Sequence, residues 1–218
     1  MSHASKHFAK VNAKKQTEAT PPNQNVDRTQ YEKMLLLLDS HKRRLKQIQS
    51  LQVKIAKKQE FLPEYQSYLD GVVSAETSPQ DDVLVTIMLW NFDCGNLEQA
   101  LKLGEYALQQ KMVMPEQFKR SLACVIAEEL ADIVVKNPEE CQLALVNKAI
   151  ELTNDQDMPD EVRAKLYKAK GLVLEIKSEF SEAFTAFQKA LELDHKCGVK
   201  GILQKIEKKL KEAENSAS

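Results

Sequence analysis

Prolines separate this sequence into segments whose apolar residues recur every three or four positions. Of 218 residues only seven are Pro and six are Gly, so there is little turn chemistry for a many-stranded fold. Apolar spacing of three and four predicts amphipathic helices, here over residues 97–112, 116–136, 139–153, 161–177, 180–194 and 199–213. Short connections between helices of this length indicate antiparallel neighbours. The predicted fold class is all-α: a long N-terminal basic helix followed by a bundle of antiparallel helical hairpins.

The first helix is predicted to be long and to have one apolar face. The residues of that face recur with a period near 3.5, which is typical of a packed seam: Tyr31, Leu35, Leu38, Leu45, Ile48 and Ile55. Thr29 is a candidate N-cap, and Glu32 three residues later completes a capping box. Pro63 is expected to end the pattern. The prediction is a helix of about 30 residues, roughly 45 Å long.

The run over residues 83–90 is apolar on all sides. By itself it is compatible with a buried strand, because Val, Thr and Ile favour strands. It follows a typical helix start, with Ser78 as the N-cap, Pro79 in the first turn, and the carboxylates of Asp81 and Asp82 at the positive end of the helix dipole. We therefore expect a central buried helix.

Two stretches are similar to helical-hairpin repeat units. The stronger has the spacing of a tetratricopeptide unit, in which two small residues let the helices approach and Phe187 fills the remaining space. Its residues are Tyr167, Gly171, Leu174, Ala183, Phe187 and Ala190. The weaker begins at Gly95 and Asn96 and continues with Ala100, Leu103 and Ala107. Two units are fewer than a free-standing solenoid needs, so we expect one bundle, tetratricopeptide-like toward the C-terminus.

The last predicted helix has an apolar side and a Lys-rich side. The apolar side consists of Val199, Ile202, Leu203, Ile206 and Leu210. The helix is interpreted either as the cap of the bundle or as a docking helix for another subunit.

Charge is distributed unequally along the chain, although the net charge is −1. Residues 1–60 carry 13 Lys and Arg against five Asp and Glu, whereas residues 61–218 carry 18 against 27. A basic arm beside an acidic body is typical of proteins that bind a polyanion. The alternative is a basic segment that is merely solvated.

The cations of the first helix are predicted to form a stripe. At 100° per residue, one face carries Leu45, Ile48, Leu51 and Ile55, and the opposite face carries Arg43, Lys46, Ser50, Lys54 and Lys57. Such a line can neutralise several phosphates of duplex DNA, which carries about one charge per 1.7 Å of axis. No aromatic residue is interleaved with the cations, which favours a duplex over a single strand. The alternative is that the cations pair with the acidic remainder. The candidate DNA-binding residues are Arg43, Arg44, Lys46, Lys54, Lys57 and Lys58.

The composition then suggests four regions. Residues 1–26 are polar and Lys-rich, so we expect a disordered basic arm. Residues 27–70 are predicted to be a helical region for DNA binding and assembly. Residues 71–213 are the predicted helical-hairpin bundle, and residues 214–218 a disordered tail.

No residue pattern typical of catalysis is evident. There is no G-x-x-x-x-G-K-[ST] and no Ser/His/Asp or Cys/His arrangement. Acidic residues are the one route to a metal-dependent nuclease: Asp81, Asp82, Asp93, Glu128 and Glu129. Capping already accounts for Asp81 and Asp82. We therefore predict no catalytic residue, no metal site and no cofactor, with a metal nuclease as the alternative.

The cysteines and the N-terminus indicate a protein of the cytoplasm. Cys94, Cys124, Cys141 and Cys197 are far apart and are expected to be small buried hydrophobes in a reducing compartment. The first residues lack the apolar core of a signal peptide, and no apolar run approaches the ~20 residues that cross a bilayer. No membrane partner is expected.

Several segments resemble one known family. They are YEKMLLLLDSHKRRLKQI over residues 31–48, KIAKK over 54–58 with FLP over 61–63, QDDVLVTIMLW over 80–90 and MPDEVRAKLYK over 158–168. In this order they resemble the small terminase subunit of contractile-tailed temperate phages, a family also called the terminase endonuclease subunit. The resemblance runs from about Tyr31 to Leu210.

The resemblance implies a role in packaging phage DNA. Small terminase subunits recognise the packaging site on double-stranded phage DNA, assemble as homo-oligomeric rings, and present the DNA to a large terminase subunit with ATPase and nuclease activity. For this chain the resemblance implies the host-cell cytoplasm and DNA contact within the matching basic segment, by Arg43, Lys46, Lys54, Lys57 and Lys58.

The name endonuclease subunit implies that DNA is cut either by this chain or by its complex with the large subunit. Because the residues show no nuclease site, we assign cutting to the partnership with the large subunit. Two alternatives stay open. One is a tetratricopeptide-like adaptor that binds protein, and the other is an endonuclease that cuts DNA itself.

Overall fold

The computed structural model describes residues 25–75, 78–115 and 119–217, and every regular element within these residues is a helix. The all-α prediction is confirmed. The chain divides into two compact units, residues 1–46 and 47–218. Of the predicted arm over residues 1–26, only the last two residues are described, and they begin a helix.

The first unit contains helix α2 (Asn25–Lys46). Since α2 begins at Asn25, Thr29 lies inside the helix, and its prediction as the N-cap is wrong. The last turn of α2 is basic, with Arg43, Arg44 and Lys46. Cations in this position are favourable because they face the negative end of the helix dipole.

The predicted helix of about 30 residues is interrupted after Lys46. Residues 48–50 have no regular structure, and α3 (Leu51–Phe61) begins in the second unit. Ser50, expected within the basic stripe, is the N-cap of α3: its backbone is extended and its Oγ accepts a hydrogen bond from the Val53 N–H at 3.4 Å. The apolar spacing could not show this break, because Leu45 before it, Ile48 within it and Ile55 after it continue the same spacing of three and seven residues.

Pro63 begins a helix that the sequence analysis missed. It was expected to end the apolar pattern, but it occupies the first turn of α4 (Pro63–Val73). A proline fits there because the first N–H groups of a helix have no intrahelical acceptor. Tyr65 and Leu69 of α4 are buried, and the Tyr65 ring meets Trp90 edge-on, with 6.1 Å between the ring centroids.

Residues 83–90 are helical, as predicted, and belong to α5 (Asp82–Asp93). The helix start differs from the prediction. The N-cap is Asp81 and not Ser78, because the Asp81 Oδ1 accepts a hydrogen bond from the Leu84 N–H at 2.8 Å. Nearly all of α5 is buried, as expected for a central helix.

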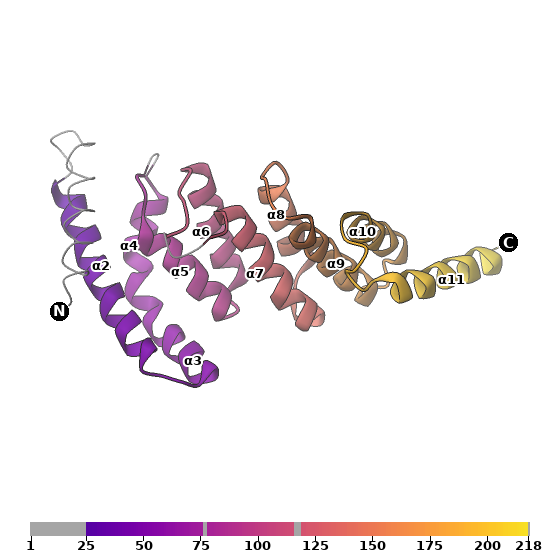
Figure 1. The fold of residues 1–218 in the computed structure, drawn as a ribbon, viewed down its shortest axis with the longest axis horizontal. Coiled ribbons are helices and arrows are strands. Elements are labelled where there is room, and N and C mark those ends of the chain that lie inside the picture. The colour runs from indigo at the N-terminus through magenta and orange to yellow at the C-terminus, as the bar shows by residue number, and fades with distance from the viewer. Residues whose placement is uncertain (1–24, 76–77, 116–118, 218) are drawn as a thin grey trace. The chain divides into compact units, whose positions relative to one another are not determined.

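The remaining helices of the second unit follow one another in chain order (Figure 1). They are α6 (Leu97–Gln109), α7 (Leu122–Lys136), the 3₁₀ turn η1 (Pro138–Glu140), α8 (Leu143–Thr153), α9 (Asp160–Ile176), α10 (Phe180–Leu193) and α11 (Lys200–Ala217). Helices α5 and α6 pack together, α7 packs on α8 and α9, and α9 packs on α10. Helix α7 begins later than predicted, at Leu122, and α11 ends later, at Ala217.

The α9–α10 contact has the packing that the sequence predicts. A Cβ placed on Gly171 would lie 2.6 Å from Cε1 of Phe187, so only glycine allows the two helices to approach this closely. Phe187 and Ala183 are fully buried. The closeness of Gly171 to Phe187 is thus confirmed, while the assignment to the tetratricopeptide class stays a prediction.

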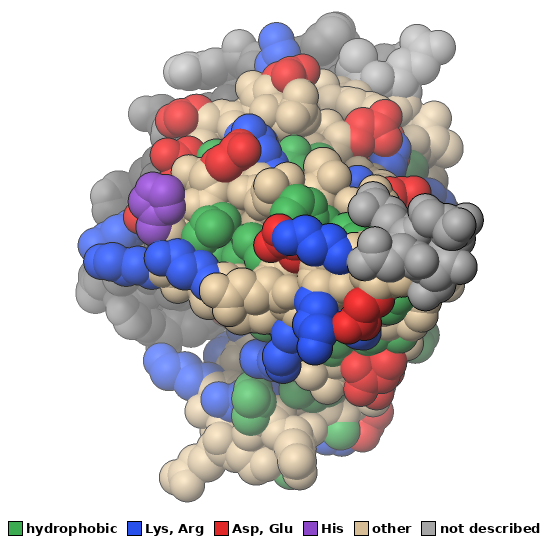
Figure 2. All heavy atoms as spheres, turned by 90° about the vertical axis from the view of Figure 1, so that its right-hand side faces the viewer, with side chains coloured by type: hydrophobic (Ala, Val, Ile, Leu, Met, Phe, Trp, Pro, Cys, Tyr) green, Lys and Arg blue, Asp and Glu red, His purple; other side chains and the backbone are tan. Residues whose placement is uncertain are grey.

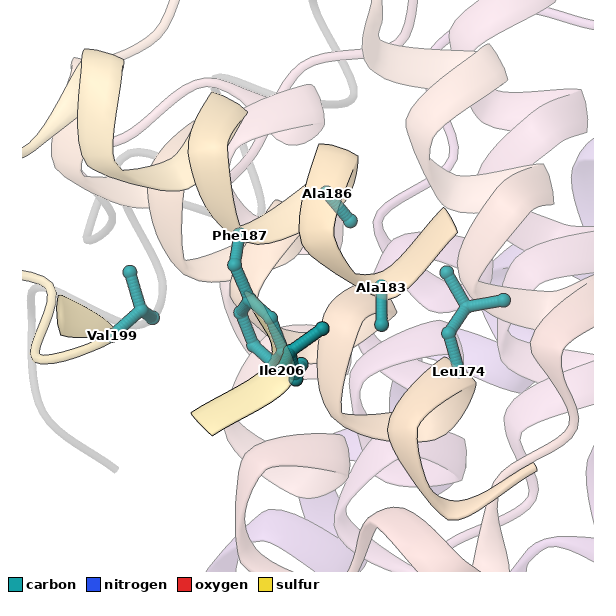
Figure 3. Packing of buried hydrophobic residues seen from close by; sticks show 6 residues of the cluster. All are labelled: Leu174, Ala183, Ala186, Phe187, Val199 and Ile206. Atoms are coloured by element: carbon teal, nitrogen blue, oxygen red, sulfur yellow. The ribbon is translucent and has the colours of Figure 1, made fainter. Parts of the chain in front are cut away.

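Helix α11 packs its apolar side onto α10. Val199 and Ile206 are fully buried and share a cluster with Leu174 and Phe187 (Figure 3). Ile202, Leu203 and Leu210 are partly buried against the same cluster. Of the two interpretations of this helix, the packing agrees with a cap on the bundle.

Candidate nucleic-acid interface

The six candidate cations are divided between the two units. Arg43, Arg44 and Lys46 belong to α2, and Lys54, Lys57 and Lys58 belong to α3. Since a new helix starts between the two groups, they are not one stripe on one helix. Each group is therefore described by itself.

The three cations at the end of α2 are exposed. The Arg43 guanidinium forms an ion pair with Asp39 one turn earlier, at 3.2 Å, and both side chains are 67% exposed. Such a pair contributes little stability, because water screens it and both side chains lose freedom. Within the described residues, Lys46 has no carboxylate partner. This turn presents its positive charge to solvent.

The three lysines of α3 have different surroundings. Lys54 and Lys57 are half-buried, and the Lys57 ammonium pairs with Glu60 on the same helix. Lys58 is more enclosed, with 15% of its side chain exposed, and its ammonium pairs with the Asp93 carboxylate at the end of α5. Lys58 therefore joins two helices of the second unit.

The buried side of α3 is not the side that the apolar spacing predicts. Leu51, expected on the apolar face opposite the cations, is 66% exposed, and Val53 is 50% exposed. Phe61 is instead 2% exposed and contacts the Trp90 ring, and Lys58 lies one turn before it. Four of the eleven residues of α3 are apolar aliphatic or Ala at irregular spacing, so the apolar pattern is too weak to determine which side packs.

Glu129 of α7 lies close enough to Lys58 and Asp93 to interact with both, and we call these three residues the polar junction. Burial raises the pKa of Glu129, and the negative charges of Asp93 and Asp132 raise it further. Lys136 and Lys58 oppose this rise. The ionised form of Glu129 is therefore less favourable in the folded chain than in water.

The other acidic residues considered for metal binding have structural partners. Asp81 caps α5 and also accepts a hydrogen bond from the Tyr68 hydroxyl at 2.5 Å, while burial raises its pKa. Glu128 pairs with Arg120. In residues 25–75, 78–115 and 119–217, no group of three or more His, Cys, Asp or Glu has a geometry that could hold a metal ion.

The cysteines are free thiols. Cys124 and Cys141 are buried, as predicted, whereas Cys94 and Cys197 are only half-buried. Burial raises the pKa of Cys94 to about 11, with Asp93 adding to the rise and Lys58 opposing it. A thiol with a raised pKa is a poor nucleophile at neutral pH.

Charges of both signs are mixed at the end of the molecule where α11 lies. Figure 2 shows Lys and Arg side chains beside Asp and Glu side chains on this face. Lys211 pairs with Glu207 at 2.7 Å, and Lys208 with Glu212 at 3.7 Å. The Lys-rich side of α11 is therefore partly neutralised along the helix. None of the described helices has the length and apolar character needed to cross a bilayer.

Comparison with known proteins identifies the family. The family model of the phage small terminase subunit matches residues 35–161. The terminase endonuclease subunit of Escherichia phage P2 is 37% identical over 215 residues, covering 96% of this chain and 86% of that protein. This chain belongs to the phage small terminase subunit family. The probable terminase endonuclease subunit of Haemophilus phage HP1 is 27% identical to this terminase subunit over 74 residues, which cover 34% of the chain and 26% of that protein. No solved structure matches the terminase chain.

The family match includes both cation groups and the polar junction. It begins within α2 at residue 35 and ends at the start of α9, at residue 161. The Gly171–Phe187 contact and α11 lie beyond it. What the sequence analysis missed is the role of Asp93, which pairs with a lysine 35 residues earlier. No local pattern signals a pair so distant along the chain.

Proposed function

We propose that this terminase subunit binds double-stranded phage DNA at the packaging site, assembles as a homo-oligomer, and recruits and regulates a large terminase subunit for DNA cutting and packaging. Family membership supports this role. The observation that carries DNA binding is the exposed basic turn of Arg43, Arg44 and Lys46 at the end of α2.

This turn has the chemistry of a phosphate-binding surface. Three cations lie within four residues, and the ion pair of Arg43 with Asp39 is exposed and weak. Adjacent phosphates of one DNA strand are close enough for neighbouring cations to contact them, and each contact releases counterions. Contacts of this kind provide affinity and orientation but do not read sequence.

The α3 lysines contribute unequally to the proposed interface. Lys54 is half-buried and has no ion pair within the described residues, so its ammonium is available for a phosphate. Lys57 would exchange Glu60, on its own helix, for a phosphate. Lys58 would have to leave Asp93, which would separate α3 from α5. We therefore propose a primary role for the α2 cations, a supporting role for Lys54 and Lys57, and the smallest role for Lys58.

Salt dependence tests this proposal. Fluorescence anisotropy with a labelled 30-bp duplex is measured for the wild type and for the triple variant Arg43→Gln/Arg44→Gln/Lys46→Gln. The variant should bind at least about tenfold more weakly near 0.1 M salt, and its plot of log K against log salt should be shallower by about 2 to 3. Native mass spectrometry with and without the duplex reports the oligomer.

The matched control removes three charges elsewhere. Lys102→Gln/Lys177→Gln/Lys189→Gln changes exposed lysines on α6, at the end of α9 and on α10. It should retain the wild-type affinity and salt slope. Equal losses in the two triple variants would mean that only net charge matters, and the proposed role of the α2 turn would be wrong.

DNA cutting by this chain itself is a second candidate, favoured by the names of the phage P2 and HP1 proteins, terminase endonuclease subunit and probable terminase endonuclease subunit. Purified chain with Mg²⁺ or Mn²⁺, and without a large subunit, would then nick supercoiled plasmid. Asp82→Asn or Glu129→Gln should abolish the nicking. An intact plasmid under these conditions assigns cutting to the partnership with the large subunit.

A further inference from the structure

A cavity of about 600 Å³ opens where the junction of α3 and α4 faces the end of α5 and the start of α6. It lies within the second unit. Five of its seven lining side chains are amides, and the lining consists of Gln59, Leu62, Pro63, Gln66, Asn91, Asn96 and Gln99. An amide offers both N–H donors and a carbonyl acceptor. The lining thus carries no charged side chain and combines amide groups with a larger apolar surface.

Some of these amides are held in place and others are free. The Asn91 side chain is 4% exposed and donates to the Ile87 carbonyl at 2.8 Å. Asn96 in turn donates to the Asn91 Oδ1 at 3.2 Å. Gln59 of α3 and Gln99 of α6 make no side-chain hydrogen bond within the described residues. The side chains of Asn91 and Asn96 are therefore fixed by hydrogen bonds, and those of Gln59 and Gln99 are available to a ligand.

The segments that form the cavity are strongly acidic. Residues 59–70 and 91–99 contain no Lys, Arg or His, and their carboxylates are Glu60, Glu64, Asp70, Asp93 and Glu98. Lys57 and Lys58 neutralise Glu60 and Asp93. Asp70 and Glu98 accept hydrogen bonds from the neutral amides of Gln66 and Gln142, so their negative charge remains beside a concave surface, where a field is concentrated. Phosphates would be repelled from this site, and cations would be attracted to it.

We propose that the cavity binds an extended, Lys- or Arg-bearing peptide segment of another protein chain. Amide side chains can pair with both the N–H and the C=O groups of an extended main chain. Leu62 and Pro63 contribute to an apolar surface that the aliphatic part of a Lys or Arg side chain can contact. The acidic segments around the cavity then select cationic side chains. The cavity shares no residue with the α2 cations, and the proposal does not depend on DNA binding.

The single tryptophan of the chain is a natural reporter for this site. Trp90 precedes Asn91 and is packed against Phe61 and Tyr65, which flank the cavity residues Leu62 and Pro63. The probes are two 12-residue peptides, one of alternating Ser and Lys and one of alternating Ser and Glu. The Ser-Lys peptide should change Trp90 fluorescence saturably, and the Ser-Glu peptide should not.

The decisive variant is Gln59→Ala/Gln99→Ala. Neither amide makes a hydrogen bond within the described residues, so the variant should keep its stability. It should bind the Ser-Lys peptide at least about fivefold more weakly, as expected for the loss of one or two hydrogen bonds. The matched control is Gln188→Ala/Gln204→Ala, which changes exposed amides on α10 and α11 and should bind as the wild type does.

Three outcomes would overturn the inference. The Ser-Lys peptide fails to bind the wild type, or the two double variants bind it equally, which would show attraction to the acidic surface as a whole. In the third, Gln59→Ala/Gln99→Ala weakens binding of the 30-bp duplex and not of the peptide, which would make the cavity a nucleic-acid site. Failure of the DNA proposal is distinguishable, because Arg43→Gln/Arg44→Gln/Lys46→Gln should leave peptide binding unchanged.

Discussion

The α9–α10 pair and the polar junction are two ways in which this chain joins helices. In the first, Gly171 and Phe187 bring two neighbouring helices into close apolar contact. In the second, Lys58 reaches Asp93 from a helix far away in the sequence, with Glu129 nearby. The spacing of apolar residues along the chain predicts the first contact. The polar junction, in contrast, depends on which distant residues the fold brings together.

This difference has energetic consequences. Close packing in a buried cluster tolerates no added volume, because neighbouring atoms have no space to move into. An ion pair with partial exposure is weaker, since water competes for both charges. Mutations should therefore have large effects at the α9–α10 pair and moderate, pH-dependent effects at the polar junction.

The largest effect is expected for Gly171→Ala. Its added methyl would lie 2.6 Å from Cε1 of the fully buried Phe187 ring. The free energy of unfolding should fall by about 1–3 kcal/mol, measured by guanidinium denaturation followed by circular dichroism. Gly201→Ala is the control, because no atom lies within 4 Å of the new Cβ in α11. The control should be neutral or stabilising; equal losses at both glycines would contradict the close contact.

A moderate effect is expected for the Lys58–Asp93 pair. A double-mutant cycle with Lys58→Met and Asp93→Asn should give a coupling free energy of about 1 kcal/mol in denaturation experiments, because Lys58 is mostly enclosed. The exposed Arg43–Asp39 pair provides the matched cycle. Its coupling should be below about 0.5 kcal/mol. Similar values for the two pairs would mean that Lys58 is solvated like a surface lysine.

Glu129→Gln should stabilise the protein in a pH-dependent way. Because the pKa of Glu129 is raised on folding, the folded chain holds this proton more tightly than the unfolded chain. The wild type therefore loses stability as the pH rises from the ordinary glutamate range through the raised pKa. The gain from Glu129→Gln should be largest above that pKa and should shrink in acid, as measured by denaturation across pH.

The control for this prediction is Glu182→Gln, which removes the same charge from an exposed position on α10. It should produce no gain at neutral pH. An equal gain in the free energy of unfolding for both variants would mean that net charge causes the effect. Burial of Glu129 beside Asp93 and Asp132 would then not be its cause.

The smallest effect is expected for Leu51→Ser. Leu51 is 66% exposed, although the sequence predicts it on the apolar face opposite the cations. The free energy of unfolding should change by no more than about 0.5 kcal/mol. A loss of about 2–5 kcal/mol, typical of a core leucine, would show that another chain or segment covers this side of α3 in solution.

The sequence was most informative where helices pack through regular apolar stripes. It predicted α9 and α10 nearly to their ends, and it predicted the approach of Phe187 to Gly171. It also identified residues 83–90 as helical, although Ser78 was wrongly chosen as the N-cap. The stripes were informative because a strong apolar period of 3.6 residues determines which face of each helix is buried.

Prediction was least successful over residues 47–73. The break before α3 and the start of α4 depend on Ser50 as a cap and Pro63 in a first turn. Both residues also suit other positions, so their roles follow from the surrounding fold. The same holds for the candidate site: six cations were evident from composition, but their different partners were not.

The sequence by itself determined the helical class, the family, the buried character of α5 and the tight contact at Gly171. These depend on local periodicity, residue size and segment order, which are all properties of a linear chain. Only the tertiary structure decided that Lys58 pairs with Asp93, that Leu51 faces outward, and that five amides from four helices or their ends meet at one cavity. Long-range electrostatic pairs and amide-lined cavities have no sequence period, because their members meet only when the helices have packed.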